Sequence, residues 1–272
     1  MRSIKDSEKI EQNSNEVLGA GLDGAKEVLE VAFSHRISLV ANALGVPPKW
    51  MLEMGKKNNV PVAALVGAKE HAIRQVQAGV DLLVVSGTEG GGHVGNVSGL
   101  VLVPEIHKAI KPISDIPILA AGGIATGHQM AGVMAMGASG VWCASVFLPT
   151  SEAETSPTVK EKMINATSSQ TVRSRSRTGK HSRQLRSGWT DAWESKDAPE
   201  PLPMPLQTMV GEPALDIIDK AAENGHQGAK ELATYWVGQG IGLVDETISA
   251  GQTVQKFKEE FLDALDRMQS LI

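Results

Sequence analysis

The sequence predicts an α/β fold in which helices cover the outside of a parallel sheet. Short apolar runs recur from residue 37 onward, and most are followed by a segment of helical periodicity. The runs lack polar–apolar alternation, which indicates strands buried on both faces. Three of them end in glycine-rich turns. Such a chain forms either an open doubly wound sheet or a closed (β/α)8 barrel, and the motifs below favour the barrel.

The element boundaries follow from where each periodicity starts and stops. Predicted strands cover residues 37–44, 60–66, 81–85, 117–121 and 140–148, and the helices between and before them cover 25–34, 47–57, 68–78 and 127–136. Pro47 and Pro48 open one helix, because proline is tolerated in a first turn. Gly79 and Gly137 close two others, because glycine readily adopts the left-handed backbone of a helix end.

Three parts follow one another along the chain. Residues 1–27 form a polar lead-in, residues 28–150 hold the alternating strands and helices, and residues 151–272 join a basic, proline-rich segment to a helical subdomain. In the last part, helices are predicted over 158–167, 215–224 and 254–271. The cationic side chains between Arg173 and Arg186 are expected to form a solvated face or local ion pairs with Asp191 and Glu194.

The composition argues against several classes of protein. The net charge of −5 disfavours a general nucleic-acid role, which needs a basic surplus. The single cysteine, Cys143, excludes an internal disulfide and fits a reducing compartment. No apolar run approaches the ~20 residues of a membrane span, and the N-terminus lacks a signal-peptide core. We expect a cytoplasmic protein without a membrane, nucleic-acid or metal partner, since no histidine has ligand companions at useful spacing.

The first glycine-rich motif, SGTEGGGHVG over residues 86–95, directly follows the predicted strand 81–85. Its five glycines allow backbone to approach a flat or charged ligand, because no Cβ intervenes. His93 would lie at the mouth of the sheet, where ligands of parallel α/β folds bind. It could act as a general base or as a hydrogen-bond donor to substrate. The equally weighted alternative is a surface loop with a solvated histidine.

Two further motifs predict an anion site. Gly122 and Gly123 end an apolar strand before a helix, where exposed amides and the positive helix end attract an anion. Ala144 and Ser145 end the next strand and could bring two amides and a hydroxyl to the same phosphate. The motifs lie one βα unit apart, as the phosphate site of (β/α)8 barrels requires. The alternative for the Gly122-Gly123 motif alone is a tight βα turn.

These strand-end motifs resemble the nitronate monooxygenase (2-nitropropane dioxygenase) family. The resemblance is carried by GTEGGGHVG (87–95), AAGGIATG (120–127) and MGASGVWCASVFL (136–148). It extends through TVRSRSRTGKHSRQLRSGWTDAWE (171–194), PLPMPLQ (201–207) and VGQGIGLV (237–244). It implies a (β/α)8 barrel with a C-terminal helical subdomain that binds FMN without a covalent link.

The resemblance also implies roles for particular residues. The cofactor-binding residues would be Gly91, Gly92, Gly122, Gly123, Ala144, Ser145 and Gln239, with the FMN phosphate held by the backbone of Gly122, Gly123, Ala144 and Ser145. His93 would be catalytic, beside the flavin and the substrate. This chain departs from the family at Ala144-Ser145, where Gly-Thr is usual, and at Ser86, where a glutamine commonly contacts the flavin.

Counting backwards along the chain predicts an incomplete barrel. If residues 140–148 form the eighth strand, residues 37–44 form the fourth, and residues 1–27 hold no credible strand for the first three. We therefore expect a barrel without its first three or so βα units, whether as a truncated product, a fragment or a chain completed by partners. Such a remnant would expose unpaired backbone and apolar faces.

The resemblance implies oxidation of alkyl nitronates or nitroalkanes by FMN and O2, giving a carbonyl compound and nitrite. The first alternative is an FMN-dependent NAD(P)H enoyl or quinone reductase, or a lipid- or steroid-catabolic flavin oxidoreductase. The second is an inactive, flavin-free barrel remnant. The partners would be a small-molecule substrate and O2, and the sequence leaves homo-oligomerisation open.

Overall fold

The computed structural model describes residues 22–271, so the predicted lead-in over residues 1–27 lies mostly outside the described residues. Helix α2 (Leu22–Phe33) is followed by the main sheet, which is parallel and five-stranded. Its strands are β1 (Val40–Asn42), β2 (Val62–Val66), β3 (Leu82–Ser86), β5 (Ile118–Ala121) and β6 (Gly140–Trp142). They lie side by side in this same order. The predicted α/β class with a parallel sheet is confirmed.

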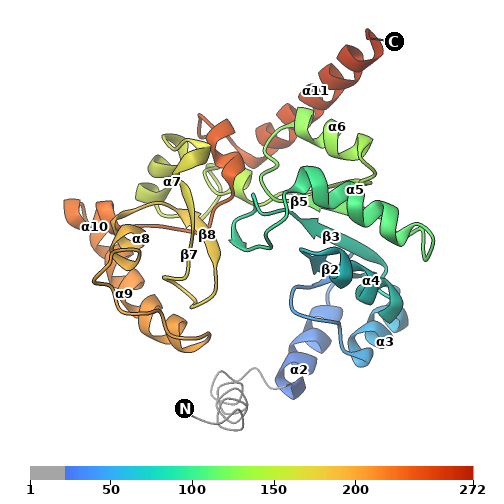
Figure 1. The fold of residues 1–272 in the computed structure, drawn as a ribbon, viewed down its shortest axis with the longest axis horizontal. Coiled ribbons are helices and arrows are strands. Elements are labelled where there is room, and N and C mark those ends of the chain that lie inside the picture. Colours follow the sequence, from blue (N-terminus) through green and yellow to red (C-terminus); the bar gives the residue numbers. More distant parts are fainter. Residues whose placement is uncertain (1–21, 272) are drawn as a thin grey trace.

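The connecting helices all pack on one face of this sheet. They are α3 (Lys49–Asn58), α4 (Lys69–Ala78), α5 (Gly99–Ile110) and α6 (Gly127–Ala135) (Figure 1). Each contributes to one outer core, for example through Leu52, Ala72, Ile106 and Val133. A doubly wound sheet reverses its strand order and carries helices on both faces. The winding is therefore the barrel-like one, although β1 and β6 each pair with one neighbour only within residues 22–271.

The strands are apolar on both faces, as the sequence predicts. Leu83 and Val85 of β3 point into the outer core beneath the helices, whereas Val84 between them belongs to a second cluster on the inner face. Successive side chains of a strand point to opposite faces. The inner cluster also contains Ala63 and Ala121, so the face of the sheet opposite the helices is lined by small and aliphatic groups.

The last strand is shorter than predicted. Residues 140–148 were expected to be one strand, but β6 ends at Trp142 and Ser145–Phe147 forms a 3-10 helix, η1. The Phe147 amide donates to the Ala144 carbonyl, and the buried Val146 side chain turns inward. An apolar run by itself does not distinguish a strand from a tight turn of similar composition. The first strand is also shorter, since β1 covers only three of the residues 37–44.

The prediction of a solvated basic face is wrong for much of the segment between Arg173 and Arg186. Strands β7 (Thr171–Ser174) and β8 (Ser182–Leu185) form an antiparallel hairpin there, and β4 (Gly92–His93) pairs with β8. Arg177 and Arg183 are buried. The expected pair of Arg186 with Asp191 is present at 2.9 Å, whereas Glu194 is in no ion pair of the described chain.

Partners far away in sequence stabilise the two buried arginines. The Arg177 guanidinium bonds both Glu212 oxygens, at 3.2 and 3.0 Å, and lies 4.1 Å from the centre of the Trp236 ring. Arg183 donates to the Thr88 carbonyl at 3.0 Å and to the Thr171 hydroxyl at 3.1 Å. A buried cation is costly unless it is paired or hydrogen-bonded. Arg177 is both ion-paired and hydrogen-bonded, whereas Arg183 is stabilised by hydrogen bonds to neutral acceptors.

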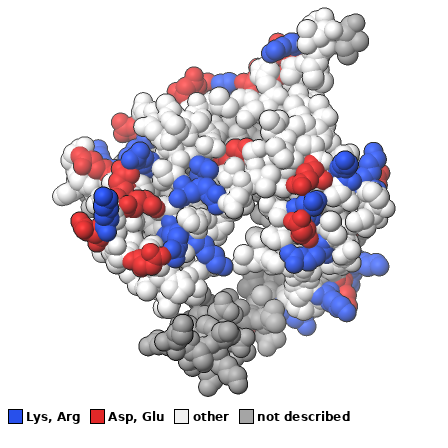
Figure 2. All heavy atoms as spheres, viewed as in Figure 1, with Lys and Arg blue, Asp and Glu red and all other residues white. Residues whose placement is uncertain are grey.

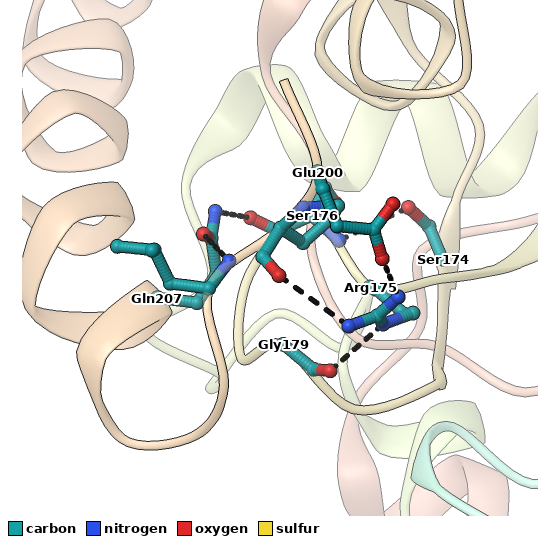
Figure 3. A network of polar contacts seen from close by, with 8 residues as sticks. Ser174, Arg175, Ser176, Gly179, Glu200 and Gln207 are labelled. Carbon is teal, nitrogen blue, oxygen red and sulfur yellow. Dashed lines mark hydrogen bonds and ion pairs between the residues drawn. The ribbon is translucent and has the colours of Figure 1, made fainter. Parts of the chain in front are cut away.

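A polar network joins the hairpin turn to the proline-rich segment (Figure 3). Arg175 pairs with Glu200 and donates to the Gly179 carbonyl at 2.9 Å. The buried Gln207 side chain donates to the Ser176 carbonyl at 2.8 Å. The turn between β7 and β8 is therefore attached to residues 200–207 at several points.

The rest of the chain is mainly helical. It comprises α7 (Pro157–Ile164), η2 (Ser168–Gln170), α8 (Gly188–Trp193), α9 (Leu206–Glu223), α10 (Gln227–Leu232), η3 (Gln239–Leu243) and α11 (Ala250–Gln269). The predicted helix 215–224 is the second half of α9. Most of this part packs around a separate core that includes Met163, Leu185 and Ile241, but α11 returns to lie against α6. No helix of residues 22–271 is long and apolar enough to cross a membrane.

The contact between α6 and α11 leads to a prediction for two glycines of one helix. A Cβ at Gly127 would overlap the carbonyl oxygen of Phe257, whereas a Cβ at Gly132 would meet no atom within 4 Å. We expect Gly127→Ala to lower the free energy of unfolding by about 1–3 kcal/mol through overpacking. Gly132→Ala, the matched control, should raise it by about 0.5–1 kcal/mol because alanine favours the helix. Urea denaturation of both variants checks this, and equal effects would contradict the packing.

Candidate active site

A cavity of about 910 Å3 lies at the carboxyl ends of the parallel strands. Its wall includes the ends of β2, β3, β5 and β6 and the glycine-rich loop after β3; the sequence-predicted residues in the wall are Gly91, His93, Gly122, Gly123, Ala144 and Ser145. Figure 2 shows a hollow between the part of the molecule that contains the parallel sheet and the part that contains the β7–β8 hairpin. Lys and Arg side chains gather on the hairpin side. The cavity brings together residues that are more than fifty positions apart in the sequence.

The tips of β5 and β6 lie next to each other at this cavity. The register pairs Ala121 with Trp142, so the residues that follow each strand leave the sheet side by side. Gly122 and Gly123 have φ angles of +96° and +70°, in the left-handed region that favours glycine. Among residues 22–271, no acceptor bonds the amides of Gly122, Gly123 and Ala144. Unpaired amides at the end of a parallel sheet form a site for an anion.

The backbone at Ala144 accommodates its side chain. Its φ of −129° lies outside the left-handed region, so the glycine usual in the family at this position is not required. Ser145 Oγ accepts a hydrogen bond from the Gly238 amide at 2.8 Å. The hydroxyl proton of Ser145 therefore remains available for a ligand, because this bond uses only an oxygen lone pair.

The segment around η3 fits between the strand tips and the glycine-rich loop. The Gln239 amide donates to the Glu89 carbonyl at 2.8 Å, and a Cβ at Gly240 would overlap the Gly123 carbonyl. It is Gly240, not Gln239, that lines the cavity. Gln239, which is predicted to bind the cofactor, is not among the residues that line this cavity.

The glycine-rich loop is held by Glu89 and by close backbone packing. The Glu89 carboxylate accepts from the Gly99 amide at 3.1 and 3.0 Å, at the start of α5, where a negative charge is favourable. A Cβ at Gly91 would lie 2.8 Å from the Val237 carbonyl carbon. Gly92 has a φ of +75° and belongs to β4, outside the cavity wall. Gly91 and Gly92 therefore shape the loop, in addition to any contact with a ligand.

His93 projects from β4 at the edge of the cavity. Its Nε2 lies 2.8 Å from the hydroxyl oxygen of Thr178, in the turn between β7 and β8. Partial burial, and secondarily the positive charge of Lys180, hold the pKa of His93 below its usual 6.5. The ring is therefore neutral at neutral pH and suited to accept a proton rather than to carry a charge.

Cys143 also lines the cavity, and burial raises the pKa of its thiol to about 11. The thiol stays protonated at neutral pH and is a poor nucleophile. Cys143 packs against the outer core as a partly buried small side chain. Among residues 22–271, no three His, Cys, Asp or Glu side chains are arranged to hold a metal ion.

Sequence reasoning missed Thr178 and Lys180 as partners of His93. Both lie in a motif that the family resemblance covers, but 85 residues separate His93 from Thr178. Trp142, Ser86, His71 and Arg74 also line the cavity. Only the pairing of β4 with β8, which no local pattern indicates, reveals that the hairpin reaches this site.

The fold and the cavity define a class of protein. It is a β/α protein whose helices cover one face of the parallel sheet, with unpaired amides at neighbouring strand tips and a histidine at the edge of the same cavity. The model of the nitronate monooxygenase family matches residues 5–260, and the chain belongs to this family.

Two curated relatives illustrate the similarity. Rv1533 of Mycobacterium tuberculosis, which carries the name of a monooxygenase, is 52% identical over 250 residues, covering 92% of this chain and 66% of that protein. A Staphylococcus aureus protein named "probable nitronate monooxygenase" is 27% identical over 221 residues, covering 78% of this chain and 59% of its own length. The chain thus spans about three fifths to two thirds of the relatives that it matches.

Two solved structures are similar in fold. FabK of Thermotoga maritima superposes with a TM-score of 0.74 at 27% identity, covering 91% of this chain and 75% of that chain. Nitroalkane oxidase of Streptomyces ansochromogenes superposes with a TM-score of 0.78 at 24% identity, covering 90% and 70%.

The position of Lys180 predicts the titration of His93. We expect a His93 midpoint below 6.5 by NMR, and Lys180→Met should raise it because one positive charge is removed. The rise should be partial, since burial is the larger cause. Lys111→Met, at the end of α5, serves as the control and should leave the midpoint unchanged. A midpoint that does not respond to Lys180→Met would contradict the proposed proximity.

Proposed function

We propose that this chain holds FMN in the cavity and oxidises alkyl nitronates or nitroalkanes with O2, giving a carbonyl compound and nitrite. The observation that carries the proposal is the meeting of unpaired strand-tip amides and a neutral histidine in one cavity. Family membership supports it, as does the similarity in fold to a nitroalkane oxidase.

The residues at the strand tips suit the phosphate of FMN. The amides of Gly122, Gly123 and Ala144 would donate to its oxygens, and the Ser145 hydroxyl would add a fourth donor. Ser86 stands where a glutamine is usual and lines the cavity. Its side chain is too short to contact the flavin ring as a glutamine would. The proposed site therefore offers more hydrogen-bond donors to the phosphate of FMN than to its ring.

The other parts of the proposed chemistry have candidate groups in the cavity or close to it. FMN, when bound, supplies the redox chemistry. Neutral His93 would accept the acidic α-proton of a nitroalkane, which yields the nitronate. The nearby Lys180 would attract the anionic nitronate toward the same place. Aliphatic groups on the inner face, such as Val84 and Leu65, would surround the alkyl part.

A second candidate is an FMN-dependent NAD(P)H enoyl or quinone reductase. It is favoured by the superposition on FabK, which is more similar in sequence than the nitroalkane oxidase is. Anaerobic stopped-flow mixing distinguishes the two. Flavin reduction by NADH or NADPH, without reduction by a nitronate, would replace the first proposal by the second. A colourless protein that cannot be reconstituted with FMN would contradict both.

The proposed phosphate site predicts a preference for FMN over riboflavin, which lacks the phosphate. We expect Ser145→Ala to weaken FMN binding roughly 10- to 100-fold, because a hydrogen bond to a charged group is lost. Riboflavin binding should change less, and fluorescence quenching measures both. Ser139→Ala, before β6 at the opposite end of the strand, is the control. An equal loss for both ligands would place the phosphate elsewhere.

The role of His93 as a base is tested by His93→Asn, which keeps a polar side chain but removes the proton acceptor. Nitroalkane turnover should fall by roughly 100-fold or more, as loss of a general base does. Turnover of the preformed nitronate should be largely retained, because its proton is already absent. Steady-state assays of nitrite release with both substrates check this, and equal losses would count against the base.

A further inference from the structure

The hydroxyl group of Thr178 has hydrogen-bond partners on three sides. Thr178 is 5% exposed in the turn between β7 and β8. Its Oγ1 donates to the Lys180 carbonyl at 3.1 Å, accepts from the Lys180 amide at 3.3 Å, and lies 2.8 Å from His93 Nε2. A hydroxyl has one proton to donate and two lone pairs. If that proton goes to the Lys180 carbonyl, the bond to His93 must use the proton of Nε2.

We infer that Thr178 is a positioning residue that holds neutral His93 as the Nε2–H tautomer and leaves Nδ1 as the free proton acceptor. Among residues 22–271, no group bonds Nδ1. The ring nitrogen that carries the proton is set by the hydrogen bond it makes. The consequence for catalysis rests on the proposed function, whereas the tautomer itself does not.

Contacts with the proline-rich segment hold the turn that carries Thr178. Gly179 has a φ of +79°, and a Cβ there would overlap the carbonyl oxygen of Leu202 in the proline-rich segment. Arg175 holds the Gly179 carbonyl at 2.9 Å (Figure 3). The backbone of His93 is held separately, by pairing with Ser182 of β8. The hydroxyl and the ring therefore meet without the entropy cost of ordering a flexible loop.

The first test is nitrogen NMR of protein labelled with 15N-histidine. His93→Asn assigns the His93 signals among the seven histidines. In the unmodified protein, we expect a protonated, pyrrole-type signal at Nε2 and a pyridine-type signal at Nδ1. Thr178→Val keeps the shape of the side chain without its hydroxyl and should produce a mixture of tautomers. Thr178→Ser keeps the hydroxyl and should preserve the original pattern.

Three outcomes would overturn the inference. The first is a proton on Nδ1 in the unmodified protein, and the second is an unchanged tautomer in Thr178→Val. The third is the same altered pattern in Thr178→Val and Thr178→Ser, because packing rather than the hydroxyl would then be responsible. None of these measurements requires turnover.

The second test is kinetic and uses the FMN-loaded protein. Thr178→Val should lower kcat/KM for a nitroalkane by roughly 10- to 100-fold, the scale of losing a group that orients a functional imidazole. The effect on the preformed nitronate should be smaller, and Thr178→Ser should recover most of the loss. Equal losses on both substrates would overturn the positioning role. The expected tautomer without turnover of either substrate would instead contradict the proposed function and leave the tautomer assignment standing.

Discussion

The cavity is organised around backbone amides that have no hydrogen-bond acceptor among residues 22–271, at the carboxyl ends of β5 and β6. Parallel pairing of Ala121 with Trp142 makes the two chains leave the sheet together. Consecutive left-handed residues at Gly122 and Gly123 then turn one tip. Amides without a protein acceptor at the end of a parallel sheet can donate to an anion, so an anion at this place would be stabilised. At the other tip, β6 is followed by the short η1 helix, where Ser145 Oγ accepts from the Gly238 amide.

The β7–β8 hairpin supplies the opposite side of the cavity and depends on burying two arginines. Arg177 is held by Glu212 and Trp236, and Arg183 by Thr88 and Thr171. Arg183 joins the hairpin directly to the glycine-rich loop, because Thr88 belongs to that loop. The position of His93 therefore depends on both the loop and the hairpin, which are far apart in sequence.

The distribution of charge is uneven even though the chain is acidic overall. The net charge is −5, yet Lys and Arg side chains gather where the hairpin faces the hollow (Figure 2). Carboxylates neutralise several of them, such as Glu212 on Arg177 and Glu200 on Arg175. Lys180 has no carboxylate within ion-pair distance in the described chain and adds a positive field beside His93. An anionic substrate would experience this local field rather than the net charge.

The sequence by itself determined the elements whose signal is local. Strands β2, β3 and β5 are continuous apolar runs, and Gly79 closes α4 with a left-handed residue as expected. The candidate residues His93, Gly122, Gly123, Ala144 and Ser145 follow from glycine-rich strand ends, since parallel strands bring their carboxyl ends together. Helix α5, with Pro104 inside it, was not among the predicted helices.

Only the tertiary structure decided the winding of the sheet and the environment of the basic segment. Strand order in a sheet depends on which faces the helices cover, and that is a property of packing rather than of periodicity. The arginines of residues 173–186 look like a solvated run because their partners, Thr88, Glu212 and Trp236, lie far away along the chain. The hydrogen bond between His93 and Thr178 could not be predicted from the sequence for the same reason. Long-range contacts of polar groups leave no local pattern, because a single side chain or carbonyl in a distant part of the chain satisfies each of them.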